Sequence, residues 1–150
     1  YTVDSVRKLL LSEDVSNALI EMDQDIATIG KQPDGANWMV GVRHPRRSRA
    51  AITRIKLNHK GFAMRGDFEH CIVFDGENYG RGLSPVDGRP IPGLLSVALI
   101  ADNCLTACSA ASVARLKTEQ AGLQWLENLG LPWMAIDRQM TCHGPLSPRA

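Results

Sequence analysis

Most of the chain before residue 80 alternates apolar and polar residues, the pattern of half-buried β-strands. Ala18, Ile20 and Met22 alternate with polar neighbours, and a β-branched run ending at Ile29 follows. This pattern predicts two strand segments around Asp23 to Asp25. Further strands are predicted in WMVGVRH (residues 38–44) and AAITRIKLNHK (residues 50–60). The alternation therefore indicates a sheet-rich region.

Turn residues separate these predicted strands. In KQPDGAN, at residues 31–37, Pro33 and the Asp34-Gly35 pair predict a hairpin that leads into WMVGVRH. A second hairpin is predicted over Cys71–Tyr79, with its turn at Asp75-Gly76. The segment GRGLSPVDGRPIPG, at residues 80–93, then carries four glycines and three prolines. These are too many breakers for regular structure, so we interpret this segment as a functional loop.

Helical spacing is found at the start of the chain and again after residue 100. Val3, Val6, Leu9 and Leu10 predict a short first helix. The run LLSVALIA (residues 94–101) is typical of a strand buried on both faces, and it leads into a predicted helix in ADNCLTACSAASVARLK (residues 101–117). Thr118 is expected to cap a last helix ended by Gly130 and Pro132, and PWMAID is a predicted final strand.

Together these elements predict one α+β domain over residues 1–137, with a mainly antiparallel sheet and packed helices. Residues 138–150 have little apolar pattern and two prolines, so we expect them to form a loose tail.

Composition excludes several classes of protein. With 150 residues, 44% of them hydrophobic, the chain fits one domain. A net charge of +1 gives no bulk attraction to nucleic acid, and the basic segment at residues 43–49 has no stacking aromatic residues. We therefore expect no nucleic-acid partner. No apolar run approaches the ~18 residues of a membrane span, and the four cysteines lack the spacing of a disulfide-rich miniprotein.

Six short segments carry a resemblance to a known family. In chain order they are YTVDSVRKLL, ALIEMDQDIATIG, NWMVGVRHP, GFAMRGDFEH, YGRGLSPVDGRP and SVALIADNCLTA. In this order they resemble the C-terminal half of the ApbE-like FAD:protein FMN transferases, and the resemblance covers the chain from Tyr1 to about Asp137. The resemblance implies a T-fold-like α+β domain, and it implies that the upstream half of the enzyme lies outside this chain.

The resemblance also implies an activity. In that family a threonine hydroxyl of an acceptor protein takes FMN from FAD, and AMP leaves, with Mg²⁺ against the diphosphate. Asp102 and Thr106 look like the metal-binding Asp and Thr of the family, and a carboxylate and a hydroxyl four residues apart on a helix can share one ion. A structural alternative is that Asp102 caps the helix and Thr106 bonds back to it.

Cofactor-binding positions are implied by the same comparison at Arg65, Gly66, Glu69, Arg81, Leu83 and Gly88. Several of the surrounding residues depart from the family. Its double glycine is Asp23 and Gln24 here, which should weaken FAD binding. Arg65 and Arg81 replace a Ser and a His, and two interpretations of them stay open: they clamp a diphosphate with their guanidinium forks, or they are solvated surface residues.

Other assignments are less specific. Cys104 and Cys108, with Cys142 and His143, offer four soft ligands for zinc, although the spacing is not that of a zinc knuckle. No catalytic residue can be assigned. The leading hypothesis is a flavin transferase that uses Mg²⁺ and FAD and completes its site with its missing N-terminal half or a partner subunit. The alternative is a non-catalytic interaction subunit of the same fold. The resemblance implies a periplasmic location, with the cytoplasm left open by the cysteines.

Overall fold

The computed structural model describes residues 1–47, 50–67, 72–80 and 82–148. Its centre is a six-stranded sheet in which every neighbouring pair is antiparallel. In sheet order the strands are β1 (Ala18–Met22), β2 (Asp25–Ile29), β5 (Gly61–Gly66), β8 (Ser96–Ala101), β9 (Trp133–Ile136) and β10 (Cys142–His143). The predicted α+β fold with a mainly antiparallel sheet is confirmed.

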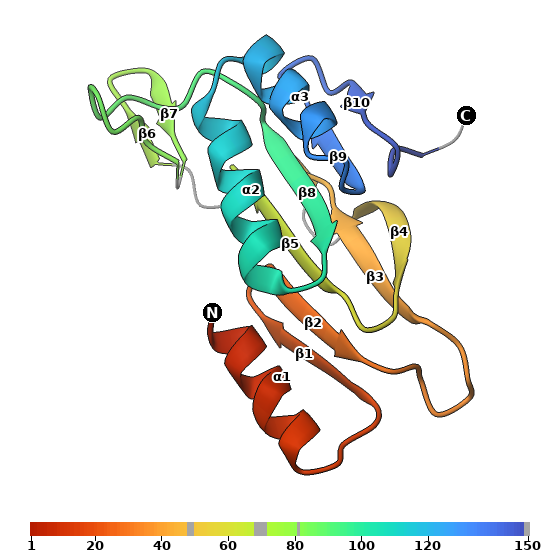
Figure 1. Ribbon diagram of the computed structural model, residues 1–150. Helices are drawn as coiled ribbons and strands as arrows, with labels where there is room; N and C mark the ends of the chain where they lie inside the picture. Colours follow the sequence, from red (N-terminus) through yellow and green to blue (C-terminus); the bar gives the residue numbers. More distant parts are fainter. Residues whose placement is uncertain (48–49, 68–71, 81, 149–150) are drawn as a thin grey trace.

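Three helices pack on one face of this sheet: α1 (Thr2–Ser12), α2 (Cys104–Leu116) and α3 (Glu119–Asn128) (Figure 1). The hairpin of β3 (Trp38–Arg43) and β4 (Ala51–Leu57) covers the opposite face. As a result β8 is buried on both sides: Val97 and Leu99 pack with the helices, while Ala98 and Ile100 pack with the β3–β4 hairpin. This agrees with its uninterrupted apolar sequence.

Helix α2 lies close to the sheet because small residues face it. Four alanines of α2 are buried there: Ala107, Ala110, Ala111 and Ala114. On the sheet side, a Cβ added at Gly61 would lie 2.2 Å from the backbone of Asn103. Only glycine fits at that position, and the contact fixes where the N-terminal end of α2 sits on β5.

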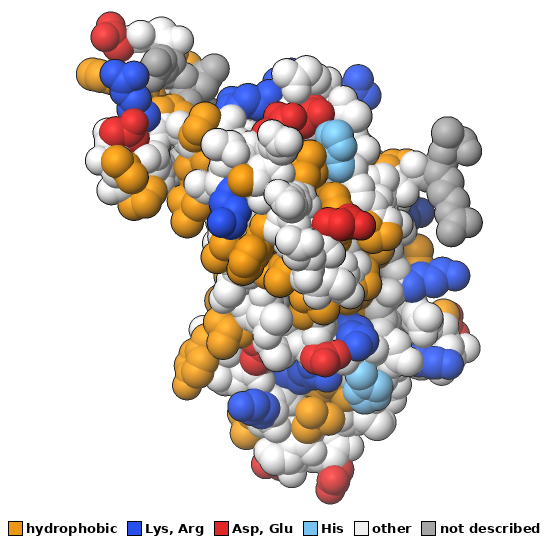
Figure 2. Space-filling model, turned by 45° about the horizontal axis from the view of Figure 1, so that its top comes forward, with side chains coloured by type: hydrophobic (Ala, Val, Ile, Leu, Met, Phe, Trp, Pro, Cys, Tyr) orange, Lys and Arg blue, Asp and Glu red, His pale blue; other side chains and the backbone are white. Residues whose placement is uncertain are grey.

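A second hairpin, β6 (Ile72–Phe74) and β7 (Glu77–Tyr79), projects from the body of the molecule (Figure 1). Its turn at Asp75-Gly76 has positive φ at both residues, as a two-residue hairpin turn requires, so this prediction is confirmed. Ile72, Val73 and Phe74 are largely exposed, and hydrophobic side chains are visible on this projection in Figure 2.

Two predictions differ from the structure. The turn around Pro33 and Gly35 does not pair its flanking strands, because β2 is already bonded to β1 and β5, while β3 pairs only with β4 among the described residues. Residues 138–148 are not loose. They add β10 to the sheet, and Arg138 donates hydrogen bonds to the carbonyls of Ile91 and Pro92.

The tail packs because its few apolar residues are well placed. Met140, Cys142 and Leu146 lie against the core on the β3–β4 side of the sheet. None of the helices in the described part of the chain has the length and apolar character needed to span a membrane.

Candidate functional site

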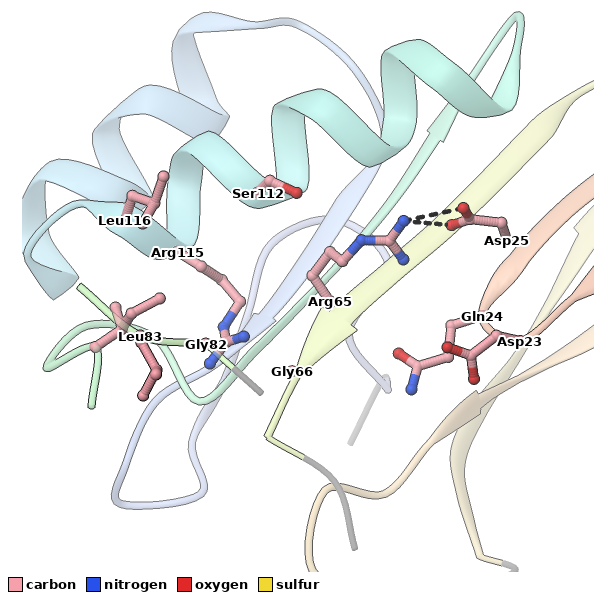
Figure 3. A pocket seen from close by; sticks show the side chains of 11 residues that line it. Asp23, Gln24, Asp25, Arg65, Gly66, Gly82, Leu83, Ser112, Arg115 and Leu116 are labelled. Atoms are coloured by element: carbon pink, nitrogen blue, oxygen red, sulfur yellow. Dashed lines mark hydrogen bonds and ion pairs between the residues drawn. The ribbon is translucent and has the colours of Figure 1, made fainter. Parts of the chain in front are cut away.

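A pocket of about 410 Å³ opens beside the C-terminal half of α2 (Figure 3). Four parts of the chain form it: the turn between β1 and β2, the end of β5, the segment around Gly82–Ile91, and α2. The lining residues are Asp23, Gln24, Asp25, Arg65, Gly66, Gly82, Leu83, Ile91, Ser112, Arg115 and Leu116. Its volume is within the range of small-molecule sites.

One side of the pocket is the tight turn between β1 and β2. Met22 pairs with Asp25, so only Asp23 and Gln24 form the turn, and Asp23 has a φ of 58°. Asp is among the few non-glycine residues that adopt this conformation readily. The Gln24 carbonyl accepts a hydrogen bond from the Met64 amide, which ties the turn to β5.

Arg65 extends from the end of β5 toward Asp25 (Figure 3). Its Nη2 atom lies 2.7 Å from Oδ1 and 3.0 Å from Oδ2 of that carboxylate. The guanidinium also donates to the Met64 carbonyl and to Sγ of Cys108 on α2. Burial by itself would lower the pKa of Arg65, but the charge of Asp25 and the contact with Cys108 outweigh it, so the pKa is raised. Arg65 is therefore a charged group at the pocket, already engaged by the protein.

Arg115 supplies the second guanidinium of the pocket, from the last turn of α2. It is buried, its Nη2 lies 2.9 Å from Oδ1 of Asp67, and its Nε donates to the Leu94 carbonyl. The contact with Asp67 is a charge contact without a well-directed hydrogen bond. A Cβ added at Gly82 would lie 3.0 Å from Nη1 of Arg115, so the glycine lets this segment pass close over the guanidinium.

The structure brings some of the residues implied by sequence to the pocket. Arg65, Gly66 and Leu83 line it. Gly88 does not, and lies in an exposed turn where its amide donates to the Ser84 carbonyl. Glu69 and Arg81 lie outside the described residues. Neither of the two interpretations of Arg65 fits fully. Its side chain is about three-quarters buried, which does not suit a solvated surface residue, and its charge is paired with Asp25, not with a diphosphate.

Asp102 and Thr106 lie at the other end of α2 and do not line the pocket. The helix begins at Cys104, so Asp102 precedes it and the two residues do not share a helix face. The Asp102 side chain is 88% exposed and forms an ion pair with Lys60 at 2.6 Å, which lowers the pKa of the carboxyl. The structural alternative also needs correction, because Asn103 is the capping residue: its side chain accepts from the Thr106 amide.

Sequence reasoning missed three polar residues that line the pocket, Asp25, Ser112 and Arg115, and it missed Cys108, which contacts Arg65. Cys108, Ser112 and Arg115 recur at i, i+4 and i+7 on α2, which is a helical face, and Ser112 Oγ donates to the Cys108 carbonyl. That spacing was a usable signal. Nothing local indicated Asp25, because its partner Arg65 is 40 residues away.

The described residues contain no cluster of three or more His, Cys, Asp or Glu side chains that could hold a metal ion. The zinc alternative is therefore wrong for these residues. Cys104 is buried in the core beneath α2, whereas Cys142 packs on the opposite side of the sheet. Burial, with nearby Asp25 and Asp4, raises the pKa of Cys104 to about 12, so its thiol stays protonated and is a poor ligand.

The chain is similar to known proteins over most of its length. The sequence profile described as the ApbE family matches residues 1–135. FAD:protein FMN transferase from Haemophilus influenzae is 28% identical over 110 residues, which are 71% of this chain and 32% of that protein. The enzyme of the same name from Escherichia coli K12 is 27% identical over 109 residues, 71% of this chain and 31% of the relative.

Solved structures agree with the sequence comparison. The ApbE protein of Thermotoga maritima superposes with a TM-score of 0.86 at 25% identity, over 99% of this chain and 51% of its own. The apo form of the flavinyl transferase ApbE from Pseudomonas stutzeri gives a TM-score of 0.76 at 27% identity, over 92% of this chain and 43% of its own. The chain thus spans about a third of the curated relatives and about half of these structures.

Proposed function

This chain belongs to the ApbE family, and on that premise we propose that it forms the flavin-binding part of a transferase that moves FMN from FAD to a protein. In the proposed reaction a threonine oxygen of the acceptor attacks the phosphorus of the FMN moiety. The bond from that phosphorus to the bridging oxygen breaks, AMP leaves with the bridging oxygen, and the hydroxyl proton passes to solvent or to the departing AMP. The observation that carries the proposal is that segments resembling separate motifs of the family converge on one pocket of suitable size.

Completion of the site by further polypeptide is part of the proposal. The relatives named FAD:protein FMN transferase are about three times as long as the segment matched here. The pocket is open to solvent, and among the described residues that line it none is assigned as a base for the threonine hydroxyl. We propose that the part corresponding to the rest of the relatives, in the same chain or in a partner subunit, supplies the remaining contacts.

The Mg²⁺ ion implied by the resemblance does not fit the residues at the pocket. Its two lining carboxylates are Asp23 and Asp25, and the second is bound by Arg65. Asp102 and Thr106 remain predicted ligands, but Asp102 is paired with Lys60 and lies away from the pocket. A hard divalent ion needs several oxygen ligands around one point, and the described residues contain no group of three or more His, Cys, Asp or Glu side chains that could supply them. No step of the mechanism is therefore assigned to a metal.

A non-catalytic interaction subunit is the second candidate. The ion pair between Arg65 and Asp25 favours it, because a pocket whose charges are already paired binds a charged ligand less readily. The acceptor protein stays a prediction of the transferase alone, and a periplasmic location stays a prediction for both candidates.

Two measurements on the 150-residue chain separate the candidates. FAD fluorescence is titrated with protein, and AMP release is followed by chromatography with and without the upstream polypeptide, in Mg²⁺ and in EDTA. The transferase proposal expects FAD binding by the chain, and AMP release with flavin bound to protein once the upstream part is present. With the upstream part present, FAD binding without AMP release would favour the interaction subunit, and no binding at high micromolar FAD would contradict the transferase.

A further inference from the structure

We propose that Arg65 is an exchangeable anion-binding group, held by Asp25 in the free protein and transferred to a phosphate of the ligand on binding, with no divalent cation required. The ligand class is a nucleoside diphosphate or its ester. Its identification as FAD rests on the proposed function, but the phosphate chemistry is shared by any nucleoside diphosphate.

The geometry of Arg65 supports exchange. Its guanidinium lies on the pocket wall, and a single nitrogen, Nη2, contacts both oxygens of Asp25. A guanidinium presents five donors in a planar fork that matches carboxylate and phosphate alike. A phosphate can therefore take the place of the carboxylate without any change in the arginine backbone. Asp25 is an internal competitor for the same donor.

The exposure of the pair makes the exchange accessible. The side chains of Arg65 and Asp25 are 27% and 26% exposed. Oδ1 of Asp25 is buried without a hydrogen-bond donor, so when Arg65 changes partner the carboxylate must rotate toward its exposed side to be hydrated, because an unpaired buried charge is costly. The pair is also held in place from α2, because Arg65 donates to Cys108 and thus stays at the pocket in either state.

Arg115 differs from Arg65 in this respect. Its side chain is 7% exposed and its partner Asp67 13% exposed. Removing that carboxylate from its arginine would strand a largely buried charge, so we assign Arg115 a supporting role. It fixes the end of α2 and the position of Gly82, while Arg65 is the group that changes partner.

The charges around the pocket affect how strongly Asp25 competes with a phosphate ligand for Arg65. Two arginines and two carboxylates line it, Arg65 and Arg115 against Asp23 and Asp25. Asp67, which pairs with Arg115, adds a third carboxylate next to the lining. Neutralising Asp25 removes one negative charge and frees Arg65 from its competitor, so anion binding should improve even though the substitution removes an ion pair.

The test is calorimetric titration of ADP into the 150-residue chain at low salt, with Mg²⁺ or with EDTA. Wild type is compared with Asp25→Asn and Arg65→Gln, and Arg54→Gln on the exposed side of β4 is the matched control for loss of one positive charge. We expect wild-type affinity in EDTA to stay within about twofold of that in Mg²⁺. Asp25→Asn should bind ADP about fivefold more tightly, and Arg65→Gln about tenfold or more weakly, with Arg54→Gln close to wild type.

Several results would overturn the inference. They are loss of ADP binding in EDTA, weaker binding by Asp25→Asn, wild-type binding by Arg65→Gln, and no ADP binding under any condition. If Arg65→Gln does not fold, the gain expected of Asp25→Asn still decides the matter, because it needs only a stable Asp25→Asn protein.

A parallel titration with FAD separates this inference from the proposed function. ADP binding in EDTA without FAD binding or AMP release would leave the anion site intact and reject the transferase. FAD transfer that strictly requires Mg²⁺, with ADP binding equally dependent on it, would keep the transferase and reject the exchange at Arg65.

Discussion

The two ends of α2 use charged side chains for different purposes. At the N-terminal end, both oxygens of Asp4 accept hydrogen bonds from the amides of Cys104 and Leu105, and Asn103 accepts from Thr106. Arg7 donates to the Asp102 carbonyl. These contacts join α1 to α2 and satisfy the helix start, and none of these residues lines the pocket.

At the C-terminal end, Ser112, Arg115 and Leu116 line the cavity, with Arg65 and Asp25 facing them from the sheet. Asp102 and Thr106, at the helix start, have the spacing expected of a metal pair, but neither of them lines the pocket. The comparison teaches that spacing along one helix does not say which end faces a ligand. That depends on which loops and strands lie next to each end.

The largest effect is expected from Arg115→Ala at the pocket end. Truncation would leave the largely buried Asp67 carboxylate without its partner, so the free energy of unfolding should fall by about 3 kcal/mol. Denaturant unfolding measures it. Arg115→Met combined with Asp67→Asn should recover most of the loss, because no charge is left buried. A loss below about 1 kcal/mol for Arg115→Ala would mean that the pair is hydrated and not structural.

A smaller effect is expected from Asp4→Ala at the other end. The change removes the acceptor of two helix amides and a negative charge near the positive end of the helix dipole. Unfolding free energy should fall by about 1–2 kcal/mol, with ADP affinity unchanged. Asp4→Asn is the control that keeps an acceptor and loses the charge. If Asp4→Ala changed ADP affinity as much as Arg65→Gln does, the N-terminal end of α2 would also take part in ligand binding, which contradicts its purely structural role.

Asn103→Ala tests the capping assignment directly. The Asn103 side chain accepts from the Thr106 amide, so its removal should cost about 1 kcal/mol in unfolding free energy. Asn103→Asp should be close to wild type, since Asp is an equally good cap. If Asn103→Ala were neutral, the helix start would be held by Asp4 alone.

The smallest effect concerns Asp102. Its hydrogen bond and charge contact with Lys60 lower the pKa of this carboxyl, so Lys60→Met should raise it toward its ordinary value. Carboxyl-carbon NMR titration measures both values. Because the folded pKa is depressed, the carboxylate favours the folded protein above its unfolded pKa, and that contribution is lost as the pH falls through the folded value. An unchanged pKa of Asp102 in Lys60→Met would show that the two side chains do not form an ion pair in solution.

The strands were the predictable part of the fold. Alternation of apolar and polar residues predicted β1 and β2 with the turn between them, and an unbroken apolar run predicted β8. Both patterns can be read from a short stretch of sequence, because burial of one or both faces of a strand determines the residue type at each position. Pairing was harder. The Pro33 to Gly35 turn has hairpin chemistry, but β2 had no free edge for β3, and strand partners are chosen over long distances in the chain.

The pocket was predictable only in part. Arg65 was found because the segment around it resembles a family motif, whereas its partner Asp25 could not be, since an ion pair between β2 and β5 leaves no local trace. The tail was misjudged for a similar reason. Met140, Cys142 and Leu146 are too few and too widely spaced to give a periodic signal, yet each meets the core.

The most direct test of the ligand site is a two-dimensional ¹H–¹⁵N NMR titration of the 150-residue chain with FAD. The account predicts that the amides of Gly66, Ser112 and Leu116 shift most, with little change at Asp102, Asn103 and Thr106. The largest shifts at Asp102 to Thr106, with the amides around the pocket unmoved, would contradict it and move the ligand to the start of α2.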